Sequence, residues 1–247
     1  MRLKASGLTH VGQVRPVNQD SYLVDADEQL YIVADGMGGH AGGEIASQLC
    51  VSEISSYMKK NYVEPDGRKS NDPDPRVSTM MASAVNHAST KIYERALEDP
   101  SLRGMGTTAT VCKVIGETAY VAHVGDSRLY LVREGFIYQM TYDHSLVSEQ
   151  VRAGLISEEE AELHHLRNVI TRSVGYQEEE DVDTCTLQLR NEDLVVMCSD
   201  GLHGPVNDRE ISTMVAKERT SAVEPLVDLA NSRGGDDNIT VVVLYAS

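Results

Sequence analysis

Four apolar stretches of this chain each meet an aspartate at one end, and that pattern limits what the chain can fold into. The first stretch, 31–34, stops at Asp35 and runs into a glycine-rich turn. The other three aspartates, each beside a glycine or a small polar residue, are Asp126, Asp200 and Asp237. One such pair is ordinary turn chemistry. Four of them at the ends of buried strands predict a shared acidic cluster.

The order of the predicted elements favours an α+β fold with antiparallel sheets. The elements do not alternate as βαβ units do, which disfavours a parallel doubly wound sheet. Two antiparallel sheets packed on each other, with helices outside, fit the order better. We expect one domain over 1–247, in which the polar stretch 64–75 is the only candidate linker. In chain order we predict strands at 3–10 and 20–24, helices at 44–60 and 76–98, a β-meander at 107–140, two short helices within 145–163, strands at 183–189 and 194–198, helices at 208–217 and 221–232, and a closing strand at 238–245.

Charge and cysteine usage narrow the class of protein. The net charge of −16 argues against a nucleic-acid partner, because phosphate backbones are bound by clustered Lys and Arg. The four cysteines have no CxxC spacing, which indicates buried thiols in a reducing compartment. The N-terminus lacks the apolar core of a signal peptide, and no apolar run approaches the ~20 residues that span a bilayer. We therefore expect a cytoplasmic protein with no membrane contact.

The glycine-rich turn after Asp35 also matches a loose nucleotide-binding pattern. Residues 36–41 satisfy GxGxx[GA] between a predicted strand and a predicted helix. The helix is followed by a loop and another helix rather than by a second parallel strand with an acidic ribose ligand. A dinucleotide site is therefore disfavoured.

A set of aspartates at strand ends points to bound cations of a particular kind. A single Asp-Gly pair would be read as a turn or a helix cap, but Asp20 adds a fifth carboxylate to the four already named. Carboxylate and carbonyl oxygens without a Cys or His cluster suit Mg²⁺ and Mn²⁺ rather than Zn²⁺. His123 and His144 are spaced too irregularly for a zinc set, and we interpret them as structural.

Paired metal ions beside an arginine suit phosphoester hydrolysis. Two metals ~3.5–4 Å apart activate water and stabilise both the attacking and the leaving oxygen. Arg15, in a proline-containing turn ahead of Asp20, is the best placed arginine for a bidentate phosphate contact. No cysteine has an arginine six residues on, and the Asp-x-Asp-x-Thr/Val nucleophile motif fails at 25–29. Of the phosphatase mechanisms compared, attack by a metal-activated water is the one that the sequence still allows.

Eight motifs, in order along the chain, resemble the PP2C (PPM) metal-dependent protein Ser/Thr phosphatases, and the bacterial branch is the more similar. The resemblance covers essentially the whole chain. The motifs are Arg15-Pro-Val-Asn-Gln-Asp20, Asp35-Gly-Met-Gly-Gly-His40, Gly106-Thr-Thr108, Gly125-Asp-Ser-Arg128, Asp143-His-Ser145, Arg167-Asn-Val-Ile-Thr-Arg172, Ser199-Asp-Gly201 and Asp237-Asn238.

The resemblance implies a binuclear Mn²⁺ or Mg²⁺ centre in an α-β-β-α sandwich. Asp35 would bridge the two ions, and the carbonyl of Gly36 would help to bind the second. Asp200 and Asp237 would complete the first ion's ligands. Asp20 would act through metal-bound water.

The resemblance also implies roles in substrate binding and catalysis. Arg15 would bind the phosphate, and a metal-bridged hydroxide would attack phosphorus in line. His40 matches the family's proposed general acid, and a pKa near ~6.5 suits proton donation at neutral pH. Asp126, with Asp200, matches a third metal position. The segment 143–172 corresponds to the flap, a region associated with substrate selection.

Two positions depart from the family pattern. Eukaryotic members commonly carry an acidic residue where this chain has Gly204, which bears on the third metal site. The flap usually reads His-Pro before its Arg-Asn, whereas this chain has His165-Leu166 there. Losing that proline removes a fixed φ and is expected to loosen the flap.

These inferences predict a monomeric enzyme that removes phosphate from phosphoserine and phosphothreonine in proteins and opposes a Ser/Thr protein kinase. One alternative is a phosphatase-like binding or sensor domain without turnover, which the full set of ligand positions disfavours. A second is a switch phosphatase that acts on one anti-sigma antagonist protein, which the lack of an appended sensor domain weakens.

Overall fold

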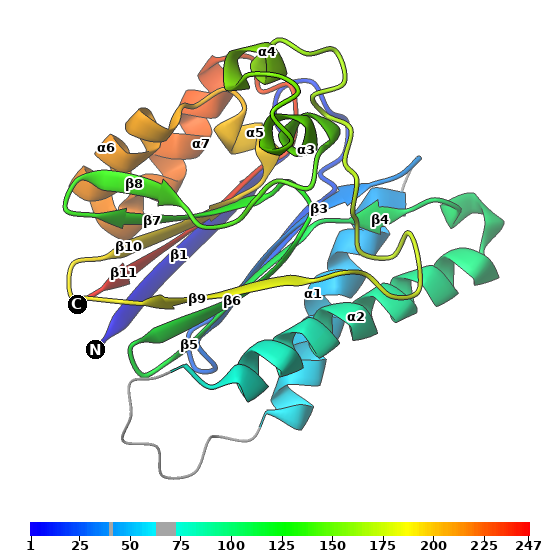
Figure 1. Cartoon of the computed structure of the whole chain (residues 1–247), viewed down its shortest axis with the longest axis horizontal. Coiled ribbons are helices and arrows are strands. Elements are labelled where there is room, and N and C mark those ends of the chain that lie inside the picture. Colours follow the sequence, from blue (N-terminus) through cyan, green and yellow to red (C-terminus); the bar gives the residue numbers. More distant parts are fainter. Residues whose placement is uncertain (40–41, 63–72) are drawn as a thin grey trace.

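Two antiparallel sheets packed face to face form the centre of the protein (Figure 1). The computed structural model describes residues 1–39, 42–62 and 73–247. The first sheet contains, in spatial order, β1 (Leu3–His10), β11 (Ile239–Ala246), β10 (Leu194–Cys198), β7 (Arg128–Arg133) and β8 (Phe136–Gln139). The second contains β2 (Asp20–Asp25), β3 (Leu30–Met37), β5 (Ala109–Ile115), β6 (Thr118–Val124) and β9 (Asp183–Gln188), with β4 (Gly106–Thr107) paired to β3.

Helices cover the outer face of each sheet, which confirms the predicted layer order. The long helices α1 (Gly42–Asn61) and α2 (Pro75–Glu98) pack on the second sheet, while α6 (Asp208–Glu218) and α7 (Val223–Ser232) pack on the first (Figure 1). The shorter helices are η1 (Pro100–Leu102), α3 (Leu146–Arg152), α4 (Glu158–Glu162), α5 (Asp200–His203) and η2 (Arg219–Ala222). Among the described residues, no helix is both long and apolar enough to cross a membrane.

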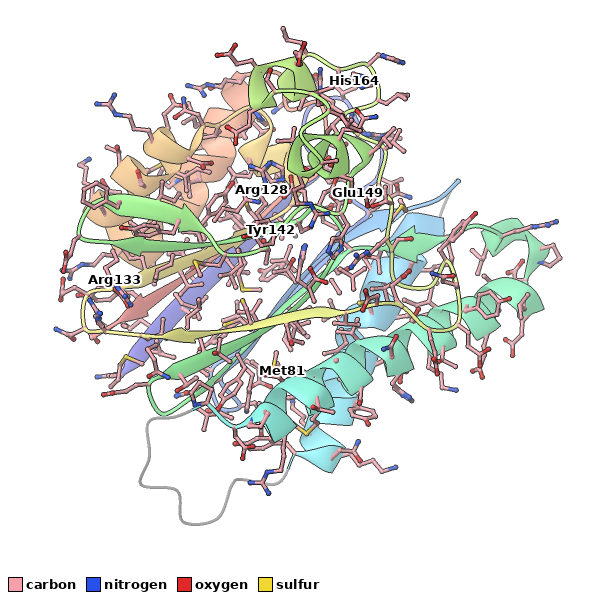
Figure 2. All side chains as sticks on the ribbon, viewed as in Figure 1. Met81, Arg128, Arg133, Tyr142, Glu149 and His164 are labelled. Carbon is pink, nitrogen blue, oxygen red and sulfur yellow. The ribbon has the colours of Figure 1, made fainter. Side chains whose placement is uncertain are left out.

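Three apolar layers follow from the alternation of side chains along the strands. On β3, Ile32 faces α1 and α2, while its neighbour Val33 faces the other sheet. Both faces of β3 are therefore buried, and its sequence reads as one apolar run. Met81 of α2, labelled in Figure 2, belongs to the layer between helices and sheet.

Local capping explains where several helices begin. The carboxylate of Asp74 accepts a hydrogen bond from the Arg76 amide, and proline follows Asp74 at the first helical position of α2. Ser157 and Asn207 each form a capping box at the start of α4 and α6, respectively.

The predicted strands and helices are confirmed outside 63–72, with one correction. Residues 107–140 do not form a single meander, because the chain leaves the second sheet after β6 and enters the first sheet at β7. The crossing occurs at Gly125, which has φ +110° and lies so close to Thr108 that a Cβ would approach its Cγ2 to 2.5 Å. Most of the polar stretch 64–75 lies outside the described residues.

The layer between the sheets should carry much of the stability. Leu244 is 1% exposed in that layer, whereas Leu97 on α2 is 69% exposed. Leu244→Ala should lower the free energy of unfolding by about 2–5 kcal/mol, because the cavity is lined on both sides by sheet. The matched Leu97→Ala change should cost less than about 0.5 kcal/mol. Urea unfolding at equilibrium measures both, and equal costs would contradict this description of the core.

Candidate active site

The predicted acidic residues meet at one end of the sandwich. In the second sheet the antiparallel register places Asp20 of β2 directly opposite Asp35 of β3. In the first sheet Cys198, at the end of β10, pairs with Arg128 at the start of β7 and with Val241 near the start of β11. The turns that carry Asp126, Asp200 and Asp237 therefore lie beside one another.

Chain termini and flap lie at opposite ends of the molecule. The two termini lie together at the far end of the first sheet, while α3, α4 and α5 gather at the other end (Figure 1). Figure 2 shows these two ends along β7, because Arg128 begins the strand near the short helices and Arg133 ends it near the chain termini.

Gly36 follows Asp35 because no side chain fits there. A Cβ at this position would lie 2.0 Å from the carbonyl oxygen of Gly43 and 2.5 Å from that of Gln19. Two backbone carbonyls therefore approach closely beside Asp35. The amide of Gly36 also donates to the carbonyl of Gln19 at 3.2 Å.

Two threonines fix the backbone of Asp35. The amide of Asp35 donates to the Thr108 hydroxyl at 2.9 Å, and its carbonyl accepts from the Thr108 amide at 2.8 Å. The Thr107 hydroxyl donates to the same carbonyl at 2.9 Å. With both main-chain groups satisfied, the carboxylate is left to the acidic cluster.

Asp20 is held by one carboxylate oxygen, and the other is free. Its Oδ2 accepts from the hydroxyls of Ser199 at 2.8 Å and Thr240 at 2.6 Å. Among the described residues, the buried side-chain polar atoms that lack a hydrogen-bond partner are Oδ1 of Asp20 and Oδ1 of Asp200. An unpaired buried acceptor costs about 1–3 kcal/mol, so both oxygens call for a donor or a cation.

Burial and mutual repulsion raise the pKa of the clustered carboxyls. Desolvation is the largest cause in each case, and the neighbouring aspartates add to it. The pKa of Asp200 rises to about 6, that of Asp20 to about 7 and that of Asp126 to about 8. The pKa of Asp35 rises well above its usual value, with repulsion from Asp20 the first electrostatic contribution.

The donor set fits hard divalent cations. It consists of carboxylate oxygens, and two of these oxygens have no hydrogen-bond partner. Burial disfavours their negative charge unless a bound cation neutralises it. In the part of the chain that the structure describes, no three His, Cys, Asp or Glu side chains converge closely enough to enclose an ion as they lie. The carboxylates would therefore have to draw in around an ion.

Arg15 reaches the cluster from an exposed loop. Its Nη2 donates to Oδ2 of Asp237 at 2.7 Å, while the Arg15 side chain remains 52% exposed. The second oxygen of Asp237 accepts from the amide of Asn238 at 2.8 Å. The structure thus brings the predicted phosphate-binding arginine to the edge of the acidic cluster.

The turn that carries Asp126 is held by two histidines. His203 of α5 contacts the Asp126 carbonyl through Nε2 at 3.1 Å, and the amide of Gly125 donates to Nδ1 of His144 at 3.1 Å. Burial lowers the pKa of both imidazoles, that of His203 to about 4. The neutral rings therefore act as hydrogen-bonding groups, as the prediction of a structural role for His144 implied.

The segment 143–172 is anchored at its base and exposed beyond it. Asp143 accepts from the Arg128 guanidinium at 2.8–3.2 Å, and His144 Nε2 lies 3.2 Å from the Asp183 carboxylate. The carbonyl of His144 accepts from the Thr171 amide at 2.8 Å, which ties the two ends of the segment together. Figure 2 shows Glu149 and His164 on the part of the segment that stands away from the sheets.

The structure therefore gathers six of the predicted site residues at one end of the sandwich. They are Arg15, Asp20, Asp35, Gly36, Asp200 and Asp237, and Asp126 lies in the adjoining turn. His40 lies outside the described residues.

Comparisons with known proteins identify the family. The family model for protein phosphatase 2C matches residues 17–239. The chain belongs to the protein phosphatase 2C family. Over 247 residues it is 38% identical to protein phosphatase PhpP of Streptococcus pneumoniae, covering 98% of this chain and 97% of that protein.

Solved structures agree with the family and the activity. The serine/threonine phosphatase PstP/Ppp of Mycobacterium tuberculosis matches with a TM-score of 0.88 and 34% identity over the full length of both chains. A PstP catalytic domain in complex with two manganese ions matches with a TM-score of 0.85 and 33% identity, covering 98% of this chain and 97% of that one. This member of the family is a metal-dependent protein serine/threonine phosphatase.

Sequence reasoning missed the residues that support the acidic cluster. Thr108, Ser199 and Asn238 occur inside recognised motifs but received no role, and Thr240 and His203 were not singled out. The available signal was a small hydroxyl or amide side chain within three residues of Asp200 and of Asp237, whereas Thr108 lies far from Asp35 in the sequence and carried no such signal. His203 gave no such signal, since α5 is too short for a periodic pattern.

Burial of neutral His123 should make stability pH-dependent. Its pKa is lowered from 6.5 to about 4 by desolvation and by His144, whose ring centroid lies 5.0 Å away. The unfolded state therefore binds more protons between these values, and stability falls as the pH falls through that window. The free energy of unfolding should fall between pH 7 and pH 5 in the wild-type protein, and this fall should be about 2 kcal/mol larger than in the His123→Gln variant.

Urea titrations at both pH values measure this difference, with exposed His165→Gln as the control that keeps the wild-type loss. Carboxyls with a raised pKa contribute the opposite slope in all three proteins, so the difference reports His123. Equal losses in wild type and His123→Gln would show that His123 is not buried neutral.

Proposed function

We propose that phosphoserine and phosphothreonine side chains of proteins are hydrolysed at the acidic end of the sandwich. The observation that carries this assignment is a cluster of buried, mutually repelling carboxyls with two unpartnered oxygens, directly beside an exposed arginine. That combination offers a place for cations and a place for a phosphate dianion next to each other.

Asp35, Asp200, Asp237 and the carbonyl of Gly36 would hold two Mn²⁺ or Mg²⁺ ions. When bound, such ions supply Lewis-acid stabilisation of the phosphoryl oxygens and an activated water. Asp20 supports the same centre through its free Oδ1, while Ser199 and Thr240 keep its other oxygen in place. Asp126 would contribute to a third, weaker ion together with Asp200.

Arg15 would bind the phosphate of the substrate. A guanidinium fork matches two phosphate oxygens at once, and its present contact with Asp237 leaves donors unused. His40 would donate the proton that the departing serine or threonine oxygen needs, a role that rests on the resemblance and on the ordinary pKa of histidine.

We further propose that this enzyme opposes a Ser/Thr protein kinase and acts as a monomer built from one domain over 1–247. All four cysteines are free thiols, three of them buried, which supports action in the reducing cytoplasm. Light scattering should give a mass of 27.1 kDa for the monomer, and twice that mass would contradict it.

Hydrolysis of p-nitrophenyl phosphate tests the proposed centre. Turnover should require Mn²⁺ and vanish with EDTA. Asp35→Ala should lower kcat with Mn²⁺ by more than roughly a hundredfold, because removing a ligand costs at least as much as removing its hydrogen-bonded support. Asp228→Ala, the same change at an exposed position on α7, should leave the rate unchanged. Full activity of Asp35→Ala would show that hydrolysis does not take place at a centre that contains Asp35.

Calorimetric titration with Mn²⁺ tests the third ion. Asp126→Asn removes one charge and one ligand oxygen while keeping the size of the side chain. It should weaken the weakest binding step by roughly tenfold or more and leave the tighter steps in place. Asp228→Asn serves as the matched control, and an Asp126→Asn isotherm that superimposes on wild type would remove Asp126 from the metal set.

A further inference from the structure

The side chain of Asn238 crosses the base of the loop that carries Arg15. Its Nδ2 donates to the carbonyl of Val11 at 2.9 Å and to the carbonyl of Val17 at 3.0 Å. Its Oδ1 accepts from the amide of Gln19 at 2.7 Å. Asn238 is 5% exposed, so one buried amide uses both of its hydrogens and its oxygen to close the loop.

The part of this loop that carries Arg15 lies outside the apolar core. Residues 13–17 are all exposed, so they gain no support from the apolar core. Beyond the amide of Asn238, the Gln13 amide donates to the Gly235 carbonyl at 2.7 Å. At the other end of the loop, the Asn18 side chain donates to the Thr9 hydroxyl at 2.9 Å, and the Gln19 carbonyl accepts from the Ser47 hydroxyl at 2.6 Å. The position of Arg15 therefore depends on hydrogen bonds rather than on packing.

The backbone of Asn238 connects the same loop to the acidic cluster. Its amide donates to Oδ1 of Asp237 at 2.8 Å, and Oδ2 of Asp237 accepts from Arg15 at 2.7 Å. One residue thus holds the base of the loop with its side chain and orients, with its main chain, the carboxylate that Arg15 contacts.

Asn238 has almost no freedom to shift. Its carbonyl oxygen lies so close to Gly201 that a Cβ there would approach it to 1.9 Å. Gly201 follows Asp200 at the start of α5, so Asn238 is packed directly against the turn that carries another carboxylate of the cluster. The amide that closes the loop is therefore fixed to the frame of the site.

We propose that Asn238 is a positioning residue for phosphate binding, which holds the loop 11–19 so that the guanidinium of Arg15 faces the substrate phosphate. This inference rests on the proposed role of Arg15. It assigns to Asn238 no contact with substrate or metal. Its effect should therefore appear in phosphate affinity and should disappear when Arg15 is absent.

The chemistry of the amide explains why this position needs asparagine. Aspartate has the same shape, but it would place an acceptor oxygen where Nδ2 now donates to the carbonyls of Val11 and Val17. Its other oxygen could still accept from the Gln19 amide. Alanine would leave all three main-chain groups without this partner. Serine could donate a hydrogen bond to at most one of the two carbonyls. Asn238→Ser is therefore a milder change, which should disturb folding less than Asn238→Ala.

The experiment measures p-nitrophenyl phosphate turnover and inhibition by inorganic phosphate at saturating Mn²⁺. Asn238→Asp, Asn238→Ala and Asn238→Ser are made alone and in an Arg15→Ala background. Melting temperature and Mn²⁺ affinity by calorimetry accompany each variant. Asn61→Asp is the matched control, because the Asn61 amide donates to a main-chain carbonyl on the exposed end of α1.

Asn238→Asp and Asn238→Ala should each raise KM and the inhibition constant of phosphate by roughly tenfold, with a smaller change in kcat and unchanged Mn²⁺ affinity. The KM and the phosphate inhibition constant of Asn238→Ser should lie between those of these variants and those of wild type. In the Arg15→Ala background the same substitutions should add less than roughly twofold, because two residues that act through one contact are not additive.

Two results would overturn the inference. Effects that multiply with those of Arg15→Ala would show that Asn238 acts independently of Arg15, and a parallel loss of Mn²⁺ affinity would place its action at Asp237 instead. If Arg15→Ala itself leaves phosphate inhibition unchanged, the proposed role of Arg15 fails first, and that outcome is distinct from a failure of the Asn238 variants alone.

Discussion

The burial of several mutually repelling carboxyls at one end of the sandwich is the constraint on which the site depends. Asp20 and Asp35 face each other across neighbouring strands, and the pKa of every clustered carboxyl that shifts is raised. A carboxyl whose pKa is raised by folding destabilises the folded protein at any pH where it is ionised. Cations that replace protons would offset this cost, and one solved relative, a PstP catalytic domain, is in complex with two manganese ions.

The rest of the fold keeps this unfavourable cluster in place. Strand register brings the turns together. The Thr108 hydroxyl holds the amide of Asp35, and the hydroxyls of Ser199 and Thr240 hold the carboxylate of Asp20. Glycines at 36 and 201 let neighbouring backbone approach where any side chain would collide. Core packing between and outside the sheets supplies the free energy that offsets the cost of the site, while the exposed loop of Arg15 and the segment 143–172 remain on its rim.

Much of this could be predicted from sequence, because the informative signals are local. Each aspartate sits at the end of an apolar run, so the cluster, the sandwich and the cation type could all be inferred. The crossing at Gly125 could not, since 118–124 and 128–133 both read as strands and nothing local says that they belong to different sheets. The amide of Asn238 contacts a loop that is 221 positions away, and such a pairing exists only once both sheets are assembled.

The most direct test compares melting temperatures of wild type and Asp35→Asn in EDTA and in saturating Mn²⁺. Without metal, the variant should melt at a higher temperature, because it removes a carboxyl whose ionised form is opposed by burial and by its acidic neighbours. With Mn²⁺ the order should reverse, because cations that bind only the folded state stabilise wild type and lose a ligand in the variant. An Asp35→Asn variant that is less stable than wild type in both conditions would contradict the claim that the cluster is assembled at a cost and completed by cations.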